Sequence, residues 1–193
     1  TALIYQMVTT GRYYFLSRPR RFVKSLLIST LEAYFQGKKE LFEGLAMEKL
    51  EKQWSVSPVL HLDLNNQEYN SRKSLEDILN DYLTRWERLY GREASETSPS
   101  LRFAGVIRRA SEKTGQNVAI LIDEYDKPLI QSLEDEELQS EYRSILKAFY
   151  GNLKTCDKYI RFALLTGVTR FSRVSIFSDL NNLNDITMDA SFA

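Results

Sequence analysis

Five apolar residues, Val118 to Ile122, run directly into two carboxylates, Asp123 and Glu124, and this segment places the strongest constraint on the fold. A short continuous apolar run bounded by polar residues is typical of a strand buried on both faces, as in a parallel sheet. Such strands end in the crevice where ligands bind. The segment therefore predicts a parallel sheet with two acids at its ligand-binding edge.

Two acids at the edge of a core need partners, because removing an unpaired charge from water is costly. Mg²⁺ and a polarised water are suitable partners. In nucleotide hydrolases of the P-loop class, the Asp after such a strand helps to hold Mg²⁺. We expect Asp123 to do so here and Glu124 to activate the attacking water. Both acids would equally favour the N-terminus of a following helix, and this alternative stays open.

A basic segment near the N-terminus has the layout of a phosphate-binding loop. A predicted strand at Tyr13–Leu16 leads through a basic turn to Lys24 and Ser25, which begin a helix. Backbone N–H groups at a helix N-terminus attract anions, a Lys in the first turn reaches β- and γ-phosphates, and a Ser hydroxyl coordinates Mg²⁺. The usual pattern is G-x-x-x-x-G-K-[ST], and Arg18 and Val23 replace both glycines. A basic surface turn that only caps a helix is therefore the alternative.

Hydrophobic periodicity divides the chain into alternating strands and helices. We expect strands at 13–16, 56–64, 118–123 and 159–167, and helices at 1–10, 24–37, 71–90, 99–115 and 138–151, with a small helical excursion at 38–54. Residues 168–193 have weak periodicity and predict a loop with short helices. This order predicts one α/β domain over residues 1–193, a three-layer sandwich with a mainly parallel sheet.

Composition and charge exclude several classes of function. The 193 residues carry no net formal charge, so nothing global draws the chain to nucleic acid or to an anionic membrane. No apolar run approaches about 18 residues, and the cytoplasm is the expected compartment. Cys156 and His61 are single, which excludes a disulfide framework and most zinc sites. We expect His61 to be a core residue of its strand, with Asp63 on the same side, near the crevice.

Three segments together resemble the bacterial AAA-ATPase-like family. They are Tyr13–Leu31, Leu121–Leu129 and Leu165–Ile186, in order and at suitable spacing. The resemblance implies an AAA+-related P-loop NTPase fold with ATP and Mg²⁺ as ligands. Many members of the family carry a C-terminal PD-(D/E)XK nuclease-like domain, for which this chain has no room. We therefore expect the chain to be a fragment that lacks a C-terminal domain.

The resemblance also assigns roles by position. Lys24 would contact the β- and γ-phosphates, Ser25 and Asp123 would hold Mg²⁺, and Glu124 would orient or activate water. Thr166 stands where a sensing polar residue follows the next strand. Arg170 and Arg173 would contact the γ-phosphate, or are surface cations instead. The nucleotide-binding set comprises Arg20, Arg21, Phe22, Val23, Lys24, Ser25, Leu26 and Thr166.

Val23 departs from the family pattern, which reads Arg-Arg-Phe-Gly-Lys-Ser at this point. If that residue needs a positive φ, a β-branched side chain is strained by about 1–3 kcal/mol. Such strain weakens nucleotide binding by about tenfold to a hundredfold. A non-catalytic interaction domain with a degenerate nucleotide site is therefore the alternative to an ATPase.

The expected partners are a nucleotide and either a protein partner or a second copy of the chain, with no membrane. Nucleic acid is expected only through the missing nuclease-like domain. A basic cluster of Arg18, Arg20 and Arg21 offers a third interpretation, direct binding of nucleic acid, although the same cluster suits the phosphates of a nucleotide.

Overall fold

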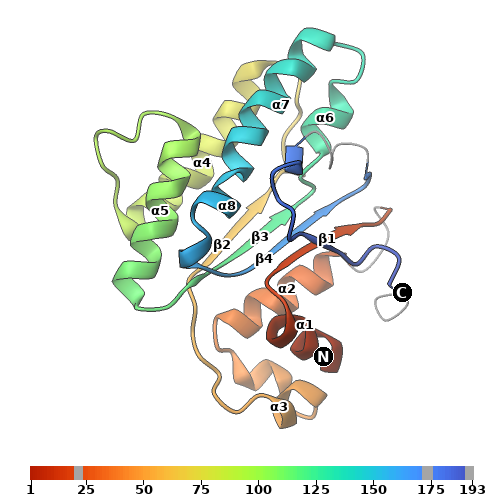
Figure 1. The fold of residues 1–193 in the computed structure, drawn as a ribbon, viewed down its shortest axis with the longest axis vertical. Coiled ribbons are helices and arrows are strands. Elements are labelled where there is room, and N and C mark those ends of the chain that lie inside the picture. The colour runs from red at the N-terminus through yellow and green to blue at the C-terminus, as the bar shows by residue number, and fades with distance from the viewer. Residues whose placement is uncertain (20–23, 171–175, 190–193) are drawn as a thin grey trace.

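The computed structural model describes residues 1–19, 24–170 and 176–189. Within these residues the strands form one parallel five-stranded sheet in the order β2-β3-β4-β1-β5 (Figure 1). The strands are β1 (Tyr13–Ser17), β2 (Val59–Asp63), β3 (Val118–Asp123), β4 (Ile160–Gly167) and β5 (Asn184–Asp185).

Helices cover both faces of the sheet. One face carries α1 (Ala2–Thr10), α2 (Lys24–Phe35), the short 3-10 helix η1 (Lys39–Phe42) and α3 (Ala46–Leu50). The other carries α4 (Arg72–Tyr90), α5 (Pro99–Thr114), α7 (Glu136–Tyr150), α8 (Asn152–Thr155) and η2 (Asp157–Tyr159) (Figure 1). The helix α6 (Lys127–Gln131) follows β3. The predicted three-layer α/β sandwich with a parallel sheet is confirmed.

The central strands are apolar on both sides because each side meets a different helix layer. Along β3, Ala119 and Leu121 pack with the α1–α3 layer, whereas Val118, Ile120 and Ile122 pack with the α4–α8 layer. This explains why the sequence of β3 shows a continuous apolar run instead of an alternating pattern. Because β3 is an interior strand, the acids at its end lie between neighbouring strand ends and not at a margin of the sheet.

Local signals in the sequence set the helix ends as expected. The Ser71 hydroxyl accepts a hydrogen bond from the Ser74 N–H at the start of α4. Ser98 caps α5 ahead of Pro99, and Gly115 ends it with φ of 68°. These caps satisfy backbone groups that a helix leaves unpaired at its ends. The apolar residues of α4 and α5 hold both helices on one face of the sheet.

Two predictions about the edges of the sheet are wrong. Residues after Gly167 were expected to form a loop with short helices; the described part is mostly loop and turn, but Asn184–Asp185 adds to β1 as the short strand β5. His61 was expected in the core, but its side chain is about 30% exposed and its Nδ1 lies 3.4 Å from a carboxylate oxygen of Glu32. The reason is that β2 is the edge strand, so its alternate residues are only partly covered. Asp63 is also partly exposed.

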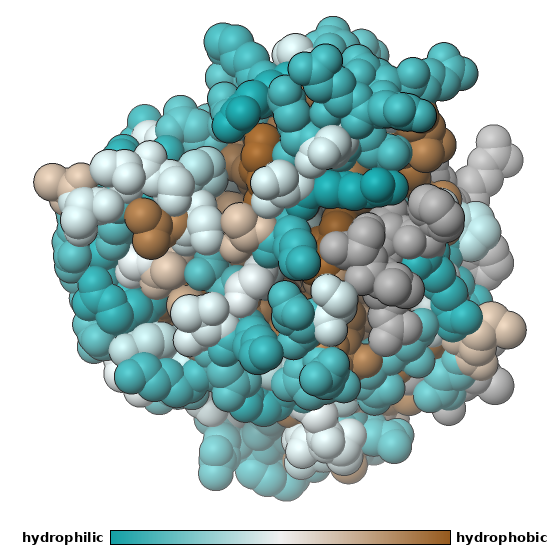
Figure 2. All heavy atoms as spheres, turned by 45° about the horizontal axis from the view of Figure 1, so that its top comes forward, coloured by the Kyte–Doolittle hydropathy of each residue, from teal (hydrophilic) through white to brown (hydrophobic). Residues whose placement is uncertain are grey.

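The surface shows no extended apolar face in the view of Figure 2, which is largely hydrophilic with small hydrophobic patches. In the parts of the chain that the structure describes, no helix has the length and apolar character needed to cross a membrane.

Candidate functional site

The candidate site lies at the carboxyl ends of β1, β3 and β4. The helix α2, which comes after β1, packs on one face of the sheet, whereas α6 and α7 after β3 and the described residues 176–183 after β4 pack on the other face. The register pairs Leu16 with Thr166 and Ser17 with Gly167, so β1 and β4 end together. A crevice at such a switch in connection side is where open parallel sheets bind ligands. The topology therefore brings Lys24, at the end of the predicted phosphate loop, and the predicted acids to one place.

A buried ion pair joins α2 to the end of β3. Lys24 Nζ lies 2.7 Å from Glu124 Oε1, and the two side chains are only 4% and 10% exposed. Lys24 Nζ also donates a hydrogen bond to the carbonyl oxygen of Gly167, at 3.2 Å. The ammonium therefore meets groups that follow two different strands. A buried charge needs such compensation, because leaving water costs more than an isolated contact returns.

Glu124 has an unusual backbone conformation. Its φ is 55°, in the left-handed region that residues other than glycine seldom adopt. The next residue is held in place, because the Tyr125 N–H donates to the carbonyl oxygen of Thr166 at 2.9 Å. Strained residues with ionisable side chains are concentrated at functional sites. The sequence contained no signal for this strain, since glutamate has no preference for positive φ.

Asp123 and Thr166 meet across β3 and β4. The Thr166 hydroxyl donates a short hydrogen bond to Asp123 Oδ1, and the Leu64 N–H donates to the carbonyl oxygen of Asp123 at 3.1 Å. Thr166 is fully buried and Asp123 is partly exposed at the end of its strand. The predicted acid and the predicted sensing residue are therefore in direct contact.

The first turn of α2 presents Ser25 and Leu26 to solvent next to the buried Lys24. The described residues contain no group of three or more His, Cys, Asp or Glu side chains that would hold a metal by themselves. A Ser hydroxyl and one carboxylate nevertheless fit Mg²⁺, which commonly uses one or two protein oxygens and completes its shell with phosphate and water. Ser25 and Asp123 are the oxygen donors that such a site would use.

The remaining predicted residues are placed differently. Arg170 is exposed, and its Nη2 lies 3.2 Å from Asp185 Oδ2 of β5. This contact places Arg170 toward β5, and neither Lys24 nor Glu124 takes part in it. The predictions for Arg20, Arg21, Phe22, Val23 and Arg173 lie outside the described residues.

Asp126 is a buried acid that the sequence analysis did not assign to the site. Its Oδ2 accepts hydrogen bonds from the Val168 N–H at 3.1 Å, the Thr169 N–H at 2.8 Å and the Thr169 hydroxyl at 3.0 Å. Burial raises the pKa of the Asp126 carboxyl, and these hydrogen bonds oppose that rise. The acid-rich run after β3 was visible in the sequence, but its partners are more than 40 residues away.

The sequence model of a family described as predicted AAA-ATPase matches residues 1–177. An uncharacterized protein from the vnfD 5' region of Azotobacter chroococcum mcd 1 is 38% identical over 196 residues. The alignment covers 100% of this chain and 37% of that relative, so the chain spans little more than a third of the relative's length. No solved structure matches the chain significantly.

Proposed function

Because the chain belongs to the predicted AAA-ATPase family, we propose that it binds ATP with Mg²⁺ at the ends of β1, β3 and β4 and hydrolyses it. The buried pair of Lys24 and Glu124 is the observation that carries this proposal. Replacing a buried ion pair by apolar side chains is often neutral or stabilising, so stability alone is a weak reason for such a pair. A lysine at a helix N-terminus beside a strand-end glutamate suits phosphate binding and water activation.

In the proposed reaction, the Lys24 ammonium exchanges its carboxylate partner for the β- and γ-phosphates. Glu124, released from Lys24, orients and activates the attacking water. Thr166 holds Asp123 in place through its hydroxyl. Ser25 and Asp123 would hold Mg²⁺, which neutralises charge that develops on the phosphates.

Backbone groups along the loop complete the proposed nucleotide site. Those of Arg20, Arg21, Phe22, Val23 and Leu26 would surround the phosphates. Arg170 would approach the γ-phosphate. Catalysis of this kind depends on positioning and charge stabilisation more than on covalent chemistry.

Calorimetric titration of MgADP and MgATP into the protein tests the binding step. We expect micromolar affinity for the unmodified chain and a loss of about tenfold or more in Lys24→Ala. Lys49→Ala is the matched control, because Lys49 is an exposed lysine of α3 on a different part of the molecule. No binding at millimolar nucleotide would contradict the proposal.

The valine in place of the family glycine favours a second candidate function, an interaction domain whose nucleotide site is impaired. Titration of Val23→Gly separates the two functions. Equal affinity in both proteins would show that the loop accepts Val23. Binding by Val23→Gly alone would assign this chain to the interaction class, with a protein partner or a second copy of the chain as its ligand. Any role with nucleic acid is proposed only through a further domain.

A further inference from the structure

The residues that follow β3 are joined to the end of β4 and the residues after it by a cluster of part-buried contacts, which we call the Asp126 clamp. It consists of Tyr125 and Asp126 on one side and Thr166 to Thr169 on the other. Besides the hydrogen bonds that Asp126 accepts from Val168 and Thr169, the Tyr125 N–H donates to the Thr166 carbonyl oxygen at 2.9 Å. The Tyr125 hydroxyl donates to the Thr169 carbonyl oxygen, also at 2.9 Å. The two segments are therefore fixed to each other by hydrogen bonds at Thr166, Val168 and Thr169.

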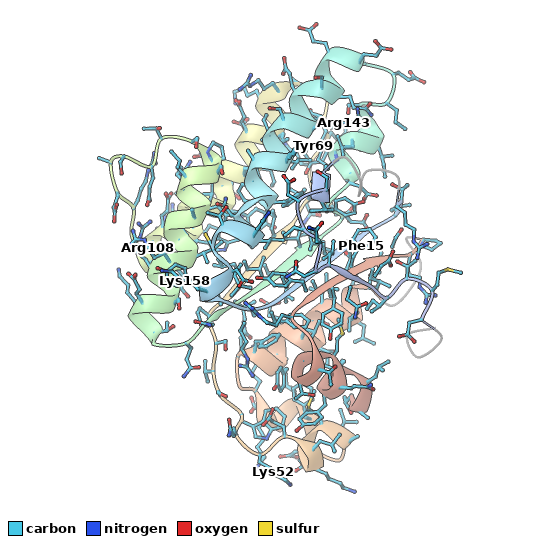
Figure 3. All side chains as sticks on the ribbon, viewed as in Figure 1. Phe15, Lys52, Tyr69, Arg108, Arg143 and Lys158 are labelled. Atoms are coloured by element: carbon cyan, nitrogen blue, oxygen red, sulfur yellow. The ribbon has the colours of Figure 1, made fainter. Side chains whose placement is uncertain are left out.

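The close approach of the two segments depends on a glycine. A Cβ atom on Gly167 would lie 2.4 Å from Tyr125 Cε1 and 2.8 Å from Asp126 Oδ1, so no larger residue fits without displacement of the clamp. Asp126 is 0% exposed. The Tyr125 ring is anchored in turn, because it packs against Phe15 of β1 with ring centroids 5.4 Å apart. Figure 3 shows Phe15 near the middle of the molecule, so the clamp is built on the core.

The clamp controls the position of a group that contacts the candidate site directly. The carbonyl oxygen of Gly167 accepts hydrogen bonds from Lys24 Nζ at 3.2 Å and from the Arg18 N–H at 3.0 Å. It precedes the Val168 N–H, which Asp126 binds. Glu124 lies two residues before Asp126, and Arg170 follows Thr169 directly. A shift of the clamp would therefore move the Gly167 carbonyl oxygen, which contacts Lys24. It would also move Glu124 and Arg170, which are close to the clamp in sequence.

We propose that Asp126 is a positioning residue for ATP hydrolysis: it holds Gly167 to Thr169 so that the Gly167 carbonyl oxygen keeps the Lys24 ammonium in position, with Glu124 beside it. This inference rests on the proposed function. Asp126 touches no reacting atom and acts through the clamp. Misplacement of a catalytic group by about 1 Å can lower a rate about a hundredfold, even when the mutated residue is remote from the reaction.

Steady-state kinetics and ADP binding test the inference in Asp126→Asn. We expect kcat for ATP to fall about tenfold to a hundredfold, because positioning acts in the transition state. ADP affinity should change less than about threefold, because the phosphate ligands themselves are retained. A residue with only a structural role would lower the melting temperature without this separation of kcat from binding.

Two variants of Thr169 keep the test decisive if Asp126→Asn folds poorly. Thr169→Val removes one hydrogen bond to Asp126 and should lower kcat severalfold, whereas Thr169→Ser retains the hydroxyl and should restore it. In the double variant of Asp126→Asn and Thr169→Val, the two losses of kcat should not add, because both substitutions affect the same contact. Glu96→Gln is the matched control: Glu96 is also a buried acid but lies between α4 and α5, and its loss should leave kcat unchanged.

The outcomes separate the inference from the proposed function. ATP turnover that is equal in the unmodified protein, Asp126→Asn and Thr169→Val would overturn the positioning role and leave the ATPase proposal intact. An unmodified protein that neither binds nor hydrolyses nucleotide would overturn the proposed function, and the positioning role with it.

Discussion

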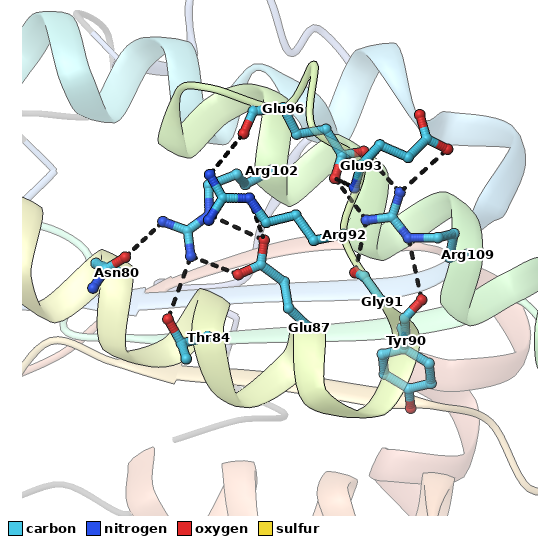
Figure 4. A network of polar contacts seen from close by, with 10 residues as sticks. All are labelled: Asn80, Thr84, Glu87, Tyr90, Gly91, Arg92, Glu93, Glu96, Arg102 and Arg109. Atoms are coloured by element: carbon cyan, nitrogen blue, oxygen red, sulfur yellow. Dashed lines mark hydrogen bonds and ion pairs between the residues drawn. The ribbon is translucent and has the colours of Figure 1, made fainter.

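Two buried ionic clusters in this molecule have opposite designs. Between α4 and α5, Arg102 and Arg109 are each bound by a carboxylate through two guanidinium nitrogens, from Glu87 and Glu96 respectively (Figure 4). At the candidate site, Lys24 is bound by one carboxylate oxygen and one carbonyl oxygen.

The remaining contacts widen the difference between the clusters. Arg102 also donates to the side chains of Asn80 and Thr84, and Arg109 donates to the carbonyl oxygens of Tyr90 and Gly91. These bonds tie the loop between α4 and α5 to both helices. In this network every guanidinium nitrogen of Arg102 and Arg109 donates a hydrogen bond, which is typical of a structural role. A lysine that has one carboxylate partner among the described residues, next to a strained backbone, is suited to exchanging that partner for a ligand.

The largest expected effect comes from breaking the α4–α5 network. Arg109→Met leaves the Glu96 carboxylate buried without its principal partner, which should lower the free energy of unfolding by about 3–5 kcal/mol. Urea unfolding measures this change. Arg108→Ala is the control, because Arg108 is a neighbouring, more exposed arginine whose pairs should contribute less than about 1 kcal/mol. Equal losses in the two variants would contradict the structural role of the network.

Glu124→Gln tests whether the Lys24 pair is exchangeable. The neutral amide competes less well for the ammonium, so affinity for MgADP should rise about threefold to tenfold, which is about 0.7–1.4 kcal/mol. ADP is the suitable probe because the protein does not hydrolyse it, so a loss of hydrolysis cannot by itself change its apparent affinity. ATP turnover should be lost in the same variant, since the proposed activating carboxylate is gone. Weaker ADP binding would show that Glu124 helps to hold the nucleotide and does not compete with it.

A smaller effect is expected in the dependence of stability on pH. The hydrogen bonds from Arg109 lower the pKa of the Glu96 carboxyl below its usual value of 4.5. A depressed pKa in the folded state stabilises the protein above pH 4.5, and this contribution is lost as the pH falls through the folded-state pKa. Glu96→Gln should therefore flatten the acid side of the stability curve. Urea midpoints measured between pH 3 and 6 test this, and an unchanged slope would contradict it.

Asp126 should show the opposite sign. Burial raises its pKa above the usual 3.8, so the folded state holds this proton more tightly than the unfolded chain does. Its contribution to stability is present below pH 3.8 and is lost as the pH rises through the folded-state pKa. Asp126→Asn should therefore remove a decline of stability above about pH 4, and the same urea series measures it. A decline that persists in the variant would rule out Asp126 as its source.

The sequence predicted the parts of the fold that depend on continuous hydrophobic runs. The β3 run and the helix starts expected at 71 and 99 are local signals, and the structure agrees with them. The strand β5 was missed because two residues carry no periodicity and are assigned only by pairing with β1. His61 was placed in the core because the order of strands, which leaves β2 at the edge, is not a local property.

The candidate site divides in the same way between local and distant signals. Lys24 and Glu124 were identified from two separate motifs, and the parallel topology brings them within 2.7 Å. The role of Asp126 could not be predicted, since its donors come from Val168 and Thr169 after the next strand. Residues whose function depends on a nearby motif can be found in a sequence, whereas those that join two distant motifs need coordinates.

The smallest expected effects on stability concern Arg170, which belongs to neither buried cluster. Its contact with Asp185 is half-exposed on the arginine side, so Asp185→Asn and Arg170→Gln should each change the free energy of unfolding by less than about 1 kcal/mol. Turnover distinguishes the two roles open to Arg170. If it contacts the γ-phosphate, as we propose, Arg170→Gln lowers kcat at least tenfold, because charge on the transferred group is stabilised in the transition state. Asp185→Asn removes only the ion pair of Arg170 and should retain most of the rate. Full activity in Arg170→Gln would identify Arg170 as a surface cation whose contact is with Asp185 of β5.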